Sequence, residues 1–459
     1  MTEKSDTTMD ENTPGLEEEQ TEKHTREEVF LKTRIFVDGV RYVVKGSSSW
    51  DPLPELDSPA NPVFIQDGTG MLIGTRPNPR SRLDCTIEGD AVTLLEMGEV
   101  LCTGKLQPRA PWRDIVMSDG TIADSGFHGT NVWSDINLNA SCHAANSGKG
   151  CKFCYFTSMP RTDHQWSLEE TLAIAERQIE ATSIAVKNGW SGIITCVGGA
   201  MPPDRRDQYT TDLLEAYMTA FRQFLDEDVV SQLPISAHVY PPDDLSLMEQ
   251  WKRFGITIIK YDLQIMDPGW YKAICPGRGS QKRWFEAQEA AVEIFGRDGS
   301  VRGDLVAGIE PMEGMLAGIE ERISKGVHCY PNPFYPLPGT PLAYMSPPSA
   351  EWYMEAFEKT AEIYTRHGYS SDLGYEPANQ SDATVEMRDD TAYSIDSTIG
   401  ELLADEKARA ILEKHVPGST TDPEIDQAMN MTLKQAASHS QGQVTDETLK
   451  AIAEDLSKL

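Results

Sequence analysis

The sequence predicts an α/β protein built on a parallel sheet. Between about residues 130 and 334, short apolar runs typical of buried strands alternate with longer segments of helical periodicity. Six strand–helix units follow one another, and this alternation is typical of parallel sheets with helical connections. Short β-like runs precede the units and an acidic helical segment follows them. We therefore expect a small N-terminal β-rich module and a C-terminal helical extension.

The composition is that of a large, strongly acidic chain. Its 459 residues include 72 Asp and Glu against 41 Lys and Arg, which gives a formal net charge of −31. Such a chain repels nucleic-acid backbones and anionic lipid, and no run approaches the ~18 apolar residues that a membrane span needs. We therefore expect no nucleic-acid partner and no membrane span. The polar N-terminus lacks the apolar core of a secretion signal, so we expect a cytoplasmic location.

Shifts in composition divide the chain into five regions. They are a disordered acidic arm at 1–27, the β-rich module at 28–125, the strand–helix units at 126–370, a linker at 371–397 and an acidic helical module at 398–459. In the β-rich module, two β-like runs flank Asp38-Gly39, which indicates a hairpin. Cys85 and Cys102 lie in predicted strands there and are expected to be buried packing residues.

The strand–helix units are defined by their apolar spacing and by helix caps. The predicted strands are 131–139, 191–199, 234–240, 256–266, 301–310 and 326–334. The predicted helices are 167–189, 207–225, 245–254, 282–295, 314–324 and 350–367. Ser167 and Glu170 form a capping box at the start of the first helix, and Gly189 ends it.

A loop with three cysteines follows the first predicted strand. Cys142, Cys151 and Cys154 form a C-x8-C-x2-C run in a segment rich in Gly, Ser, Asn and Lys, which has no core to build. Three thiols in such a loop usually bind a metal or a metal cluster. Zinc would need a fourth ligand. His143 could supply it, but it is adjacent to Cys142 in sequence, and two neighbouring residues chelate one metal ion poorly. A four-iron cluster on three thiolates fits better and leaves one iron open, while zinc or unligated thiols remain alternatives.

Other unusual residues fall at the carboxyl ends of the predicted strands. In parallel barrels this is where functional residues gather. They are Gly198, Gly199, His238, Tyr240, Tyr261, Asp262, Gln264, Glu310 and Asn332.

From about residue 130 to residue 345, the chain resembles the radical S-adenosylmethionine (SAM) enzymes, and most of all their biotin-synthase-like branch. Four motifs carry the resemblance: the cysteine run with Phe153 before its last cysteine, Gly198-Gly199, the segment LVAGIE ending at Glu310, and YPNPFYPLPGTPLA. Two features depart from the family pattern. The first cysteine spacing is eight residues instead of three, and Ala200 stands where many members have an acid.

The resemblance implies a partial TIM barrel of six β/α units that binds a [4Fe-4S] cluster and SAM. It implies reductive cleavage of SAM to a deoxyadenosyl radical, which abstracts hydrogen from a small-molecule substrate in a biosynthetic pathway. It also implies a flavodoxin or ferredoxin-type electron donor. The reaction subtype stays open.

The resemblance also implies roles for individual residues, although none is assigned to catalysis. Cys142, Cys151 and Cys154 would ligate the cluster. The expected SAM-binding residues are Phe153, Gly198, Gly199, Asp262, Gln264 and Glu310. The candidates for the substrate wall are His238, Tyr240, Tyr261 and Tyr335. Each has a simpler interpretation as a turn glycine, a solvated strand end, a helix cap or a core aromatic.

Other functions remain open at this point. One is a non-catalytic iron–sulfur or zinc protein, and another is a radical SAM enzyme that modifies a peptide or protein gripped by the β-rich module. Cys196, Cys275 and Cys329 fall in or just after predicted strands and are expected to be small buried residues. They form no C-x2-C pair, so a second cluster is not predicted.

Overall fold

The computed structural model describes most of the chain. The described residues are 26–44, 63–78, 80–130, 133–164, 166–369, 395, 397, 399–404, 406–421, 425–428, 431–439 and 444–456. The predicted acidic arm at 1–27 and linker at 371–397 lie almost wholly outside them.

The N-terminal module consists of one helix and a mixed sheet. Its elements are α1 (Arg26–Asp38), β1 (Arg41–Val44), β2 (Val63–Gln66), β3 (Leu72–Gly74), β4 (Leu83–Glu88), β5 (Ala91–Glu96) and β6 (Glu99–Leu106). The sheet has the order β1-β4-β5-β6-β2-β3, and β4, β5 and β6 form an antiparallel meander. Cys85 and Cys102 are buried in this sheet, as expected.

The hairpin predicted around Asp38-Gly39 is wrong. The run before Asp38 is α1, and β1 pairs in parallel with β4 instead of folding back on a preceding strand. Val29, Thr33 and Val37 are spaced four residues apart, so they share one face of a helix, and all three are buried. Thr33 lies on Met354 of another helix. This tertiary contact, which short-range patterning cannot show, stabilises helix over strand.

The central sheet is parallel and follows the chain order. Its strands are β7 (Trp133–Asn139), β8 (Ile193–Gly198), β9 (Ile235–His238), β10 (Ile258–Lys260), β11 (Val301–Arg302), β12 (Leu305–Ala307) and β13 (Pro331–Pro333). The first five pair in parallel from β7 to β11, and β12 pairs in parallel with β13.

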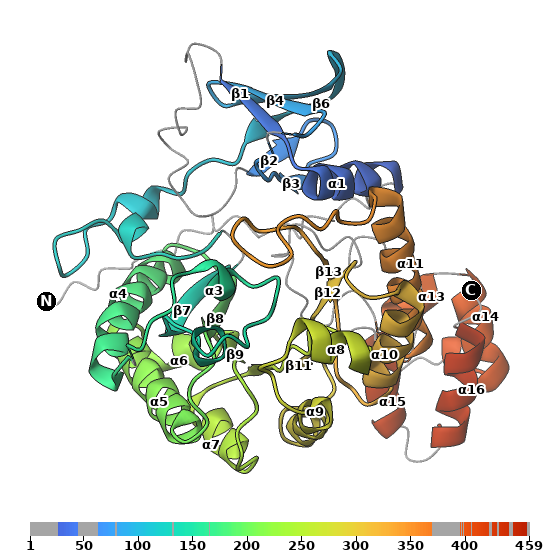
Figure 1. Cartoon of the computed structure of the whole chain (residues 1–459). Coiled ribbons are helices and arrows are strands. Elements are labelled where there is room, and N and C mark those ends of the chain that lie inside the picture. Colours follow the sequence, from blue (N-terminus) through green and yellow to red (C-terminus); the bar gives the residue numbers. More distant parts are fainter. Residues whose placement is uncertain are drawn as a thin grey trace, which may run out of the picture.

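Two bridges join these sheets into one curved wall. Gln264 pairs with Leu305, and Arg302 pairs with His328, both in parallel. β11 and β12 are therefore two halves of the fifth predicted strand, and the wall runs through six strand positions. Within the described residues no pairing closes β13 onto β7, so the barrel is partial. The predicted α/β fold class is confirmed (Figure 1).

Helices cover the outer face of this wall (Figure 1). The longer ones are α4 (Leu168–Lys187), α5 (Arg206–Phe224), α7 (Leu247–Phe254), α9 (Gln281–Phe295), α10 (Met312–Ser324) and α11 (Ala350–Arg366). The shorter ones are η1 (Pro111–Asp114), η2 (Ala123–Ser125), α2 (His143–Asn146), α3 (Tyr155–Ser158), α6 (Glu227–Val230) and α8 (Pro268–Ile274). The capping box of Ser167 and Glu170 is present at the start of α4.

Alternation along the strands separates an apolar outer face from a polar inner one. On the fourth strand, Ile259 and Tyr261 are fully buried and belong to the apolar core. Lys260 and Asp262 alternate with them and therefore face the barrel interior. The fourth strand thus places ionisable side chains on the inner face of the barrel.

The N-terminal module lies at the end of the last strand, above the barrel mouth (Figure 1). Its Phe36 ring meets the Tyr335 ring edge-on at 6.0 Å between centroids. The Arg76 guanidinium lies 5.4 Å from the same ring centroid. Tyr335 lies two residues after β13, so the module packs against the carboxyl end of the last strand.

The C-terminal segment is helical and has its own small core. Its elements are α13 (Ile399–Ala404), α14 (Glu406–His415), η3 (Ser419–Thr421), η4 (Ile425–Ala428), α15 (Leu433–His439) and α16 (Asp446–Leu456). Leu402, Leu412 and Ile452 are buried together there. The exact domain boundaries stay a prediction. No helix in the described ranges is long and apolar enough to cross a membrane.

Candidate functional site

The three cysteines lie on one loop at the carboxyl end of β7. Cys142 precedes α2 and Cys154 precedes α3, and these two short helices shape the loop around Cys151. All three side chains are partly exposed, whereas the other five cysteines are buried. This is the strand end at which the sequence predicts a binding site.

Backbone hydrogen bonds hold the loop from three directions. His143 N donates to Ala200 O at 2.8 Å, which ties the loop to the turn after β8. Lys152 N donates to Ile274 O at 2.9 Å, which ties it to the end of α8. Lys152 O accepts from Leu342 N at 3.3 Å, which ties it to the segment after β13. The cysteine positions are therefore set by the fold and not by the loop alone.

Paired glycines allow the loop to lie this close. A Cβ on Gly199 would sit 2.0 Å from Ser141 O, and one on Gly198 would sit 2.4 Å from Asn139 N. Both distances are far inside van der Waals contact. The Gly198-Gly199 pair thus permits close packing of the cysteine loop on β8. The expected contact of this backbone with SAM is compatible with that role and stays a prediction.

The thiols differ in how readily they ionise. A hydrogen bond from the Cys275 thiol, helped by the Arg278 guanidinium, holds the pKa of Cys151 below its usual range. Burial raises the pKa of Cys154 to about 11, and the nearby Cys151 and Cys142 thiolates contribute to that rise. The three thiols, Cys142, Cys151 and Cys154, are therefore close enough to interact electrostatically.

This set of donors fits an iron–sulfur cluster. Thiolates are the ligands that hold [4Fe-4S] clusters, and three of them lie on one partly exposed loop. In the described ranges, no three His, Cys, Asp or Glu side chains converge as they would around a single metal ion.

Two further functional candidates are Cys275, which the sequence predicts only as a small buried residue, and Arg278, which the sequence did not single out. Cys275 is buried as expected, but its thiol lies against Cys151. The Arg278 guanidinium lies 4.0 Å from the Trp284 ring centroid and 5.0 Å from that of Tyr240, and it donates to the Asp262 carbonyl. The only signal in the sequence was a basic residue in a Cys-Pro-Gly-Arg turn. Cys196 and Cys329 are fully buried packing residues.

A charged network occupies the barrel interior beneath this turn. His238 Nε2 lies 2.6 Å from Asp262 Oδ2, and Lys260 Nζ lies 3.3 Å from Asp304 Oδ2. Asp304 N donates to Asp262 Oδ1 at 3.0 Å. Burial alone would raise the pKa of Asp262, but His238 and Lys260 hold it below its usual range. Both Asp262 oxygens thus have partners within the protein, so a contact with the SAM ribose gains no support here.

Gln264 and Glu310 stabilise strand ends. Gln264 has a left-handed backbone, with φ of 76°, and pairs with β12 through its own backbone. Glu310 is buried, and its two carboxylate oxygens accept from Met266 N at 2.7 Å and Asp267 N at 2.6 Å. It therefore fixes the turn before α8 and does not cap the helix that follows it. The expected SAM contacts of both residues stay predictions.

The aromatic candidates separate into two groups. Tyr240 lies beside Arg278 and is close to the cysteine loop, and Tyr335 is 38% exposed at the mouth. Tyr261, in contrast, is fully buried and packs edge-on against Trp284 on the outer face of the sheet. Tyr261 therefore belongs to the core and does not line a substrate site. Phe153 is partly buried against the core, and Asn332 lies in β13.

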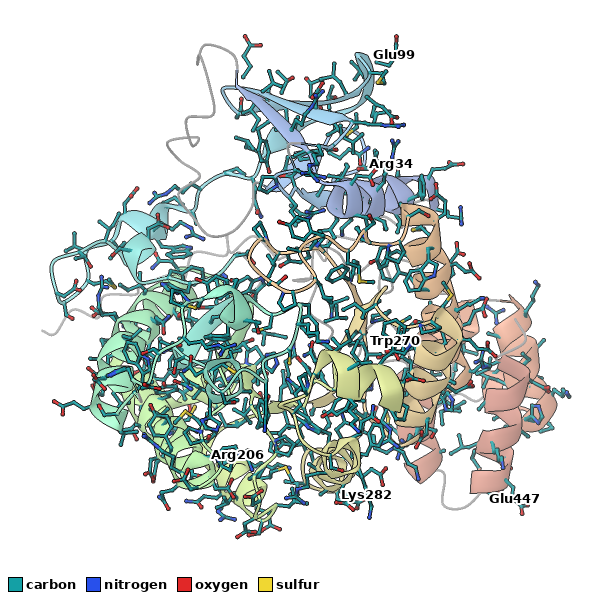
Figure 2. The ribbon with its side chains drawn as sticks, viewed as in Figure 1. Arg34, Glu99, Arg206, Trp270, Lys282 and Glu447 are labelled. Atoms are coloured by element: carbon teal, nitrogen blue, oxygen red, sulfur yellow. The ribbon has the colours of Figure 1, made fainter. Side chains whose placement is uncertain are left out.

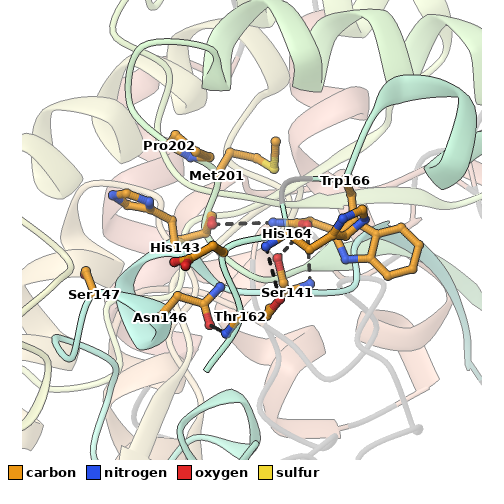
Figure 3. A pocket seen from close by; sticks show the side chains of 12 residues that line it. Ser141, His143, Asn146, Ser147, Thr162, His164, Trp166, Met201 and Pro202 are labelled. Atoms are coloured by element: carbon orange, nitrogen blue, oxygen red, sulfur yellow. Dashed lines mark hydrogen bonds between the residues drawn. The ribbon is translucent and has the colours of Figure 1, made fainter. Parts of the chain in front are cut away.

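The unusual length of the cysteine loop builds one wall of a pocket (Figure 3). The pocket holds about 270 Å³ next to the ends of β7 and β8. The residues between the first two cysteines contribute His143, Asn146 and Ser147, and the segment before α4 contributes His164 and Trp166. The added residues are therefore part of a cavity wall and not a disordered bulge.

We expect Cys151 to be alkylated before Cys154 in the cluster-free protein. The thiolate is the reactive form, and at about pH 7.5 a lowered pKa favours it at Cys151 while a raised pKa disfavours it at Cys154. Cleavage after Lys152 places the two thiols in different peptides, so mass spectrometry after brief iodoacetamide treatment reads each one. Equal labelling would contradict the described environment.

We expect Gly199→Ala to reduce iron and sulfide loading several-fold after anaerobic reconstitution. The added methyl group would sit 2.0 Å from Ser141 O and would push the cysteine loop away from β8. Gly314→Ala is the matched control, because its Cβ meets nothing within 4 Å. Normal loading of the Gly199→Ala protein would show that the close packing is dispensable.

Comparisons with known proteins agree with this site. No family model matches the sequence. The bacteriochlorophyllide c C-7(1)-hydroxylase of Chlorobaculum limnaeum is 33% identical over 396 residues, which span 81% of this chain and 95% of the relative.

Solved structures show weaker likeness. Coproporphyrinogen III oxidase (HemN) from Escherichia coli, described as a radical SAM enzyme, is 18% identical with a TM-score of 0.38, over 52% of this chain and 54% of that one. The hydrogenase maturase HydG from Carboxydothermus hydrogenoformans is 16% identical with a TM-score of 0.38, over 71% and 81%. The curated relative spans four-fifths of this chain, and with the three-thiol loop on a partial parallel barrel it shows that the chain belongs to the radical SAM enzymes.

Proposed function

We propose that this radical SAM enzyme hydroxylates a substituent of a tetrapyrrole macrocycle. The observation that carries the proposal is the 33% identity to a bacteriochlorophyllide c hydroxylase over 95% of that protein. Identity over almost the whole relative includes the parts that would contact substrate as well as the cofactor-binding loop. The enzyme uses a [4Fe-4S] cluster and SAM in a biosynthetic reaction.

We propose Cys142, Cys151 and Cys154 as the cluster ligands. Three observations support this assignment: the cysteines share one loop, their side chains are partly exposed, and their thiols interact electrostatically. When bound, the cluster supplies the electron that cleaves SAM and so generates the radical that takes a hydrogen atom from substrate. The surrounding chain positions the reactants and limits the access of water.

The polar barrel interior is the proposed substrate chamber. His238 is held by Asp262 at 2.6 Å and keeps 30% of its side chain exposed, so it is oriented and still accessible. Lys260, at 12% exposure, lies in the same interior. Both can meet the polar substituents of a macrocycle, while Tyr240 offers it an aromatic face. Neither the non-catalytic alternative nor the peptide-modifying one gains support from any contact described here.

We expect Cys151→Ala to abolish the brown cluster colour and all reductive cleavage of SAM. Two remaining thiolates cannot hold the cluster as three do. Cys85→Ala, which removes a buried thiol from the N-terminal module, is the matched control and should keep both properties. Absorbance after anaerobic reconstitution and deoxyadenosine release after dithionite reduction are the measurements. A Cys151→Ala protein that keeps both would end the assignment.

We expect the reconstituted enzyme, with SAM and dithionite, to add one oxygen atom from water to a bacteriochlorophyllide, with SAM as the two-electron oxidant that ends as methionine and deoxyadenosine. Mass spectrometry of the pigment and quantification of deoxyadenosine measure this together. Omission of SAM is the control and should leave the pigment unchanged. The tetrapyrrole proposal fails if deoxyadenosine accumulates while every bacteriochlorophyllide and related chlorin offered is recovered intact.

A further inference from the structure

The hydroxylation proposed above releases a proton inside the barrel. Overall, a C–H group of the substrate, SAM and water give the alcohol, methionine, deoxyadenosine and one proton. The new C–O bond uses an electron pair of the water oxygen, and the water O–H bond that breaks releases this proton. SAM is the two-electron oxidant, so no other oxidant is needed. A side chain that accepts the proton beside the substrate would therefore accelerate the transfer of oxygen.

His238 lies on the inner face of the barrel, at the carboxyl end of β9. It aligns with Lys260 of β10 in the parallel register, and Lys260 faces the interior. Ile235 and Ala237 point to the other face and are fully buried in the apolar core. The His238 side chain keeps 30% of its surface exposed. It is therefore open to the chamber that we propose for the substrate.

The contact with Asp262 decides which ring nitrogen of His238 can accept a proton. Nε2 lies 2.6 Å from Asp262 Oδ2, while Oδ1 accepts from Asp304 N at 3.0 Å. Burial alone would raise the pKa of Asp262, but His238 and Lys260 hold it below its usual range, so the carboxylate is ionised and only accepts hydrogen bonds. Nε2 therefore carries the hydrogen, and in the neutral ring the lone pair is on Nδ1. Within the described part of the chain, Nδ1 has no hydrogen-bond partner.

The neighbouring polar side chains are less suited to accept this proton. Lys260 Nζ and Asp304 Oδ2 form an ion pair at 3.3 Å. Burial raises the pKa of Tyr240 above its usual range, so its phenol stays protonated. The Arg278 guanidinium has no acceptor atom. His238 is thus the side chain of this network that is partly exposed and has a nitrogen lone pair available.

A short series of contacts joins the pair of His238 and Asp262 to the cysteine loop. The Arg278 side chain donates to the Asp262 carbonyl. The turn that carries Arg278 begins at the end of α8, where Ile274 O accepts from Lys152 N at 2.9 Å. The pair therefore lies at the end of the barrel that holds the proposed cluster ligands.

We propose that His238, held by Asp262, is the general base of the hydroxylation. Nδ1 accepts the proton of the water whose oxygen forms the C–O bond, and Nε2–H stays hydrogen-bonded to Asp262. The carboxylate stabilises the imidazolium that results. The inference rests on the proposed function, because a reaction that does not add water needs no such base.

The test compares His238→Gln with the unsubstituted reconstituted enzyme in the bacteriochlorophyllide assay. Glutamine keeps an N–H donor for Asp262 but has no nitrogen that accepts a proton. Hydroxylated pigment per deoxyadenosine should fall about tenfold or more. Hydrogen abstraction needs no base, so deoxyadenosine formation itself should change much less. The electron paramagnetic resonance spin count after dithionite reduction reports whether the cluster is intact in the variant.

His415→Gln is the matched control. His415 Nε2 lies 2.8 Å from Asp455 Oδ2 and its side chain is 17% exposed, so the substitution alters the same kind of pair. Asp455 belongs to α16, and Figure 2 shows Glu447 of that helix at the periphery of the molecule, away from the central strands. This variant should keep both deoxyadenosine formation and pigment hydroxylation.

A second variant decides the matter if His238→Gln also loses deoxyadenosine formation. In His238→Ala, added imidazole supplies a proton acceptor in place of the missing ring and should raise pigment hydroxylation several-fold. No gain with imidazole would then overturn the proposal.

Two other results would overturn the base as well. They are an unchanged ratio of hydroxylated pigment to deoxyadenosine in His238→Gln, and an equal loss in His415→Gln. In both cases the unsubstituted enzyme still hydroxylates the pigment, so the proposed function stands. If the unsubstituted enzyme makes no hydroxylated pigment, the proposed function fails, and the base fails with it.

Discussion

Close contact between the cysteine loop and the turn after β8 is the constraint on which the rest of this structure depends. Gly199 has no side chain, so Ser141 can lie against it, and His143 N donates to Ala200 O across the same contact. The loop is too polar to be held by a core of its own. Hydrogen bonds to three neighbouring segments therefore add to the packing of Phe153 against the barrel core, and together they fix the positions of the thiols.

The second requirement is a barrel interior that accepts charge. His238, Lys260, Asp262 and Asp304 form a connected set, in which each ionised group has an opposite charge within reach. Isolated charges in such an interior would carry a large desolvation cost, whereas paired ones are tolerated. Glu310 serves the neighbouring turn by accepting two backbone hydrogen bonds. Of the polar residues at the strand ends, Glu310 thus stabilises a turn, whereas His238 stays partly accessible.

Much of the fold could be predicted from local patterning. The six strand positions follow from apolar runs between helices, and the capping box of Ser167 and Glu170 marks the start of α4. The hairpin at Asp38-Gly39 was wrong, because the helical α1 is stabilised by its contact with α11 and not by the turn signal. Tyr261 follows a strand like Tyr240 does, yet one packs in the core and the other lies by the cysteine loop, and sequence position alone does not separate them.

The sequence by itself determined the chemistry, because three thiols in a loop rich in Gly, Ser, Asn and Lys have few stable uses other than metal binding. It also determined the parallel architecture, since strand–helix alternation leaves few other connections. Only the tertiary structure decided that Cys275 and Arg278 lie against Cys151, and that the end of α8 and the segment after β13 meet at the cysteine loop. These residues are more than a hundred positions from the loop, and contacts over such distances arise only when the chain is folded.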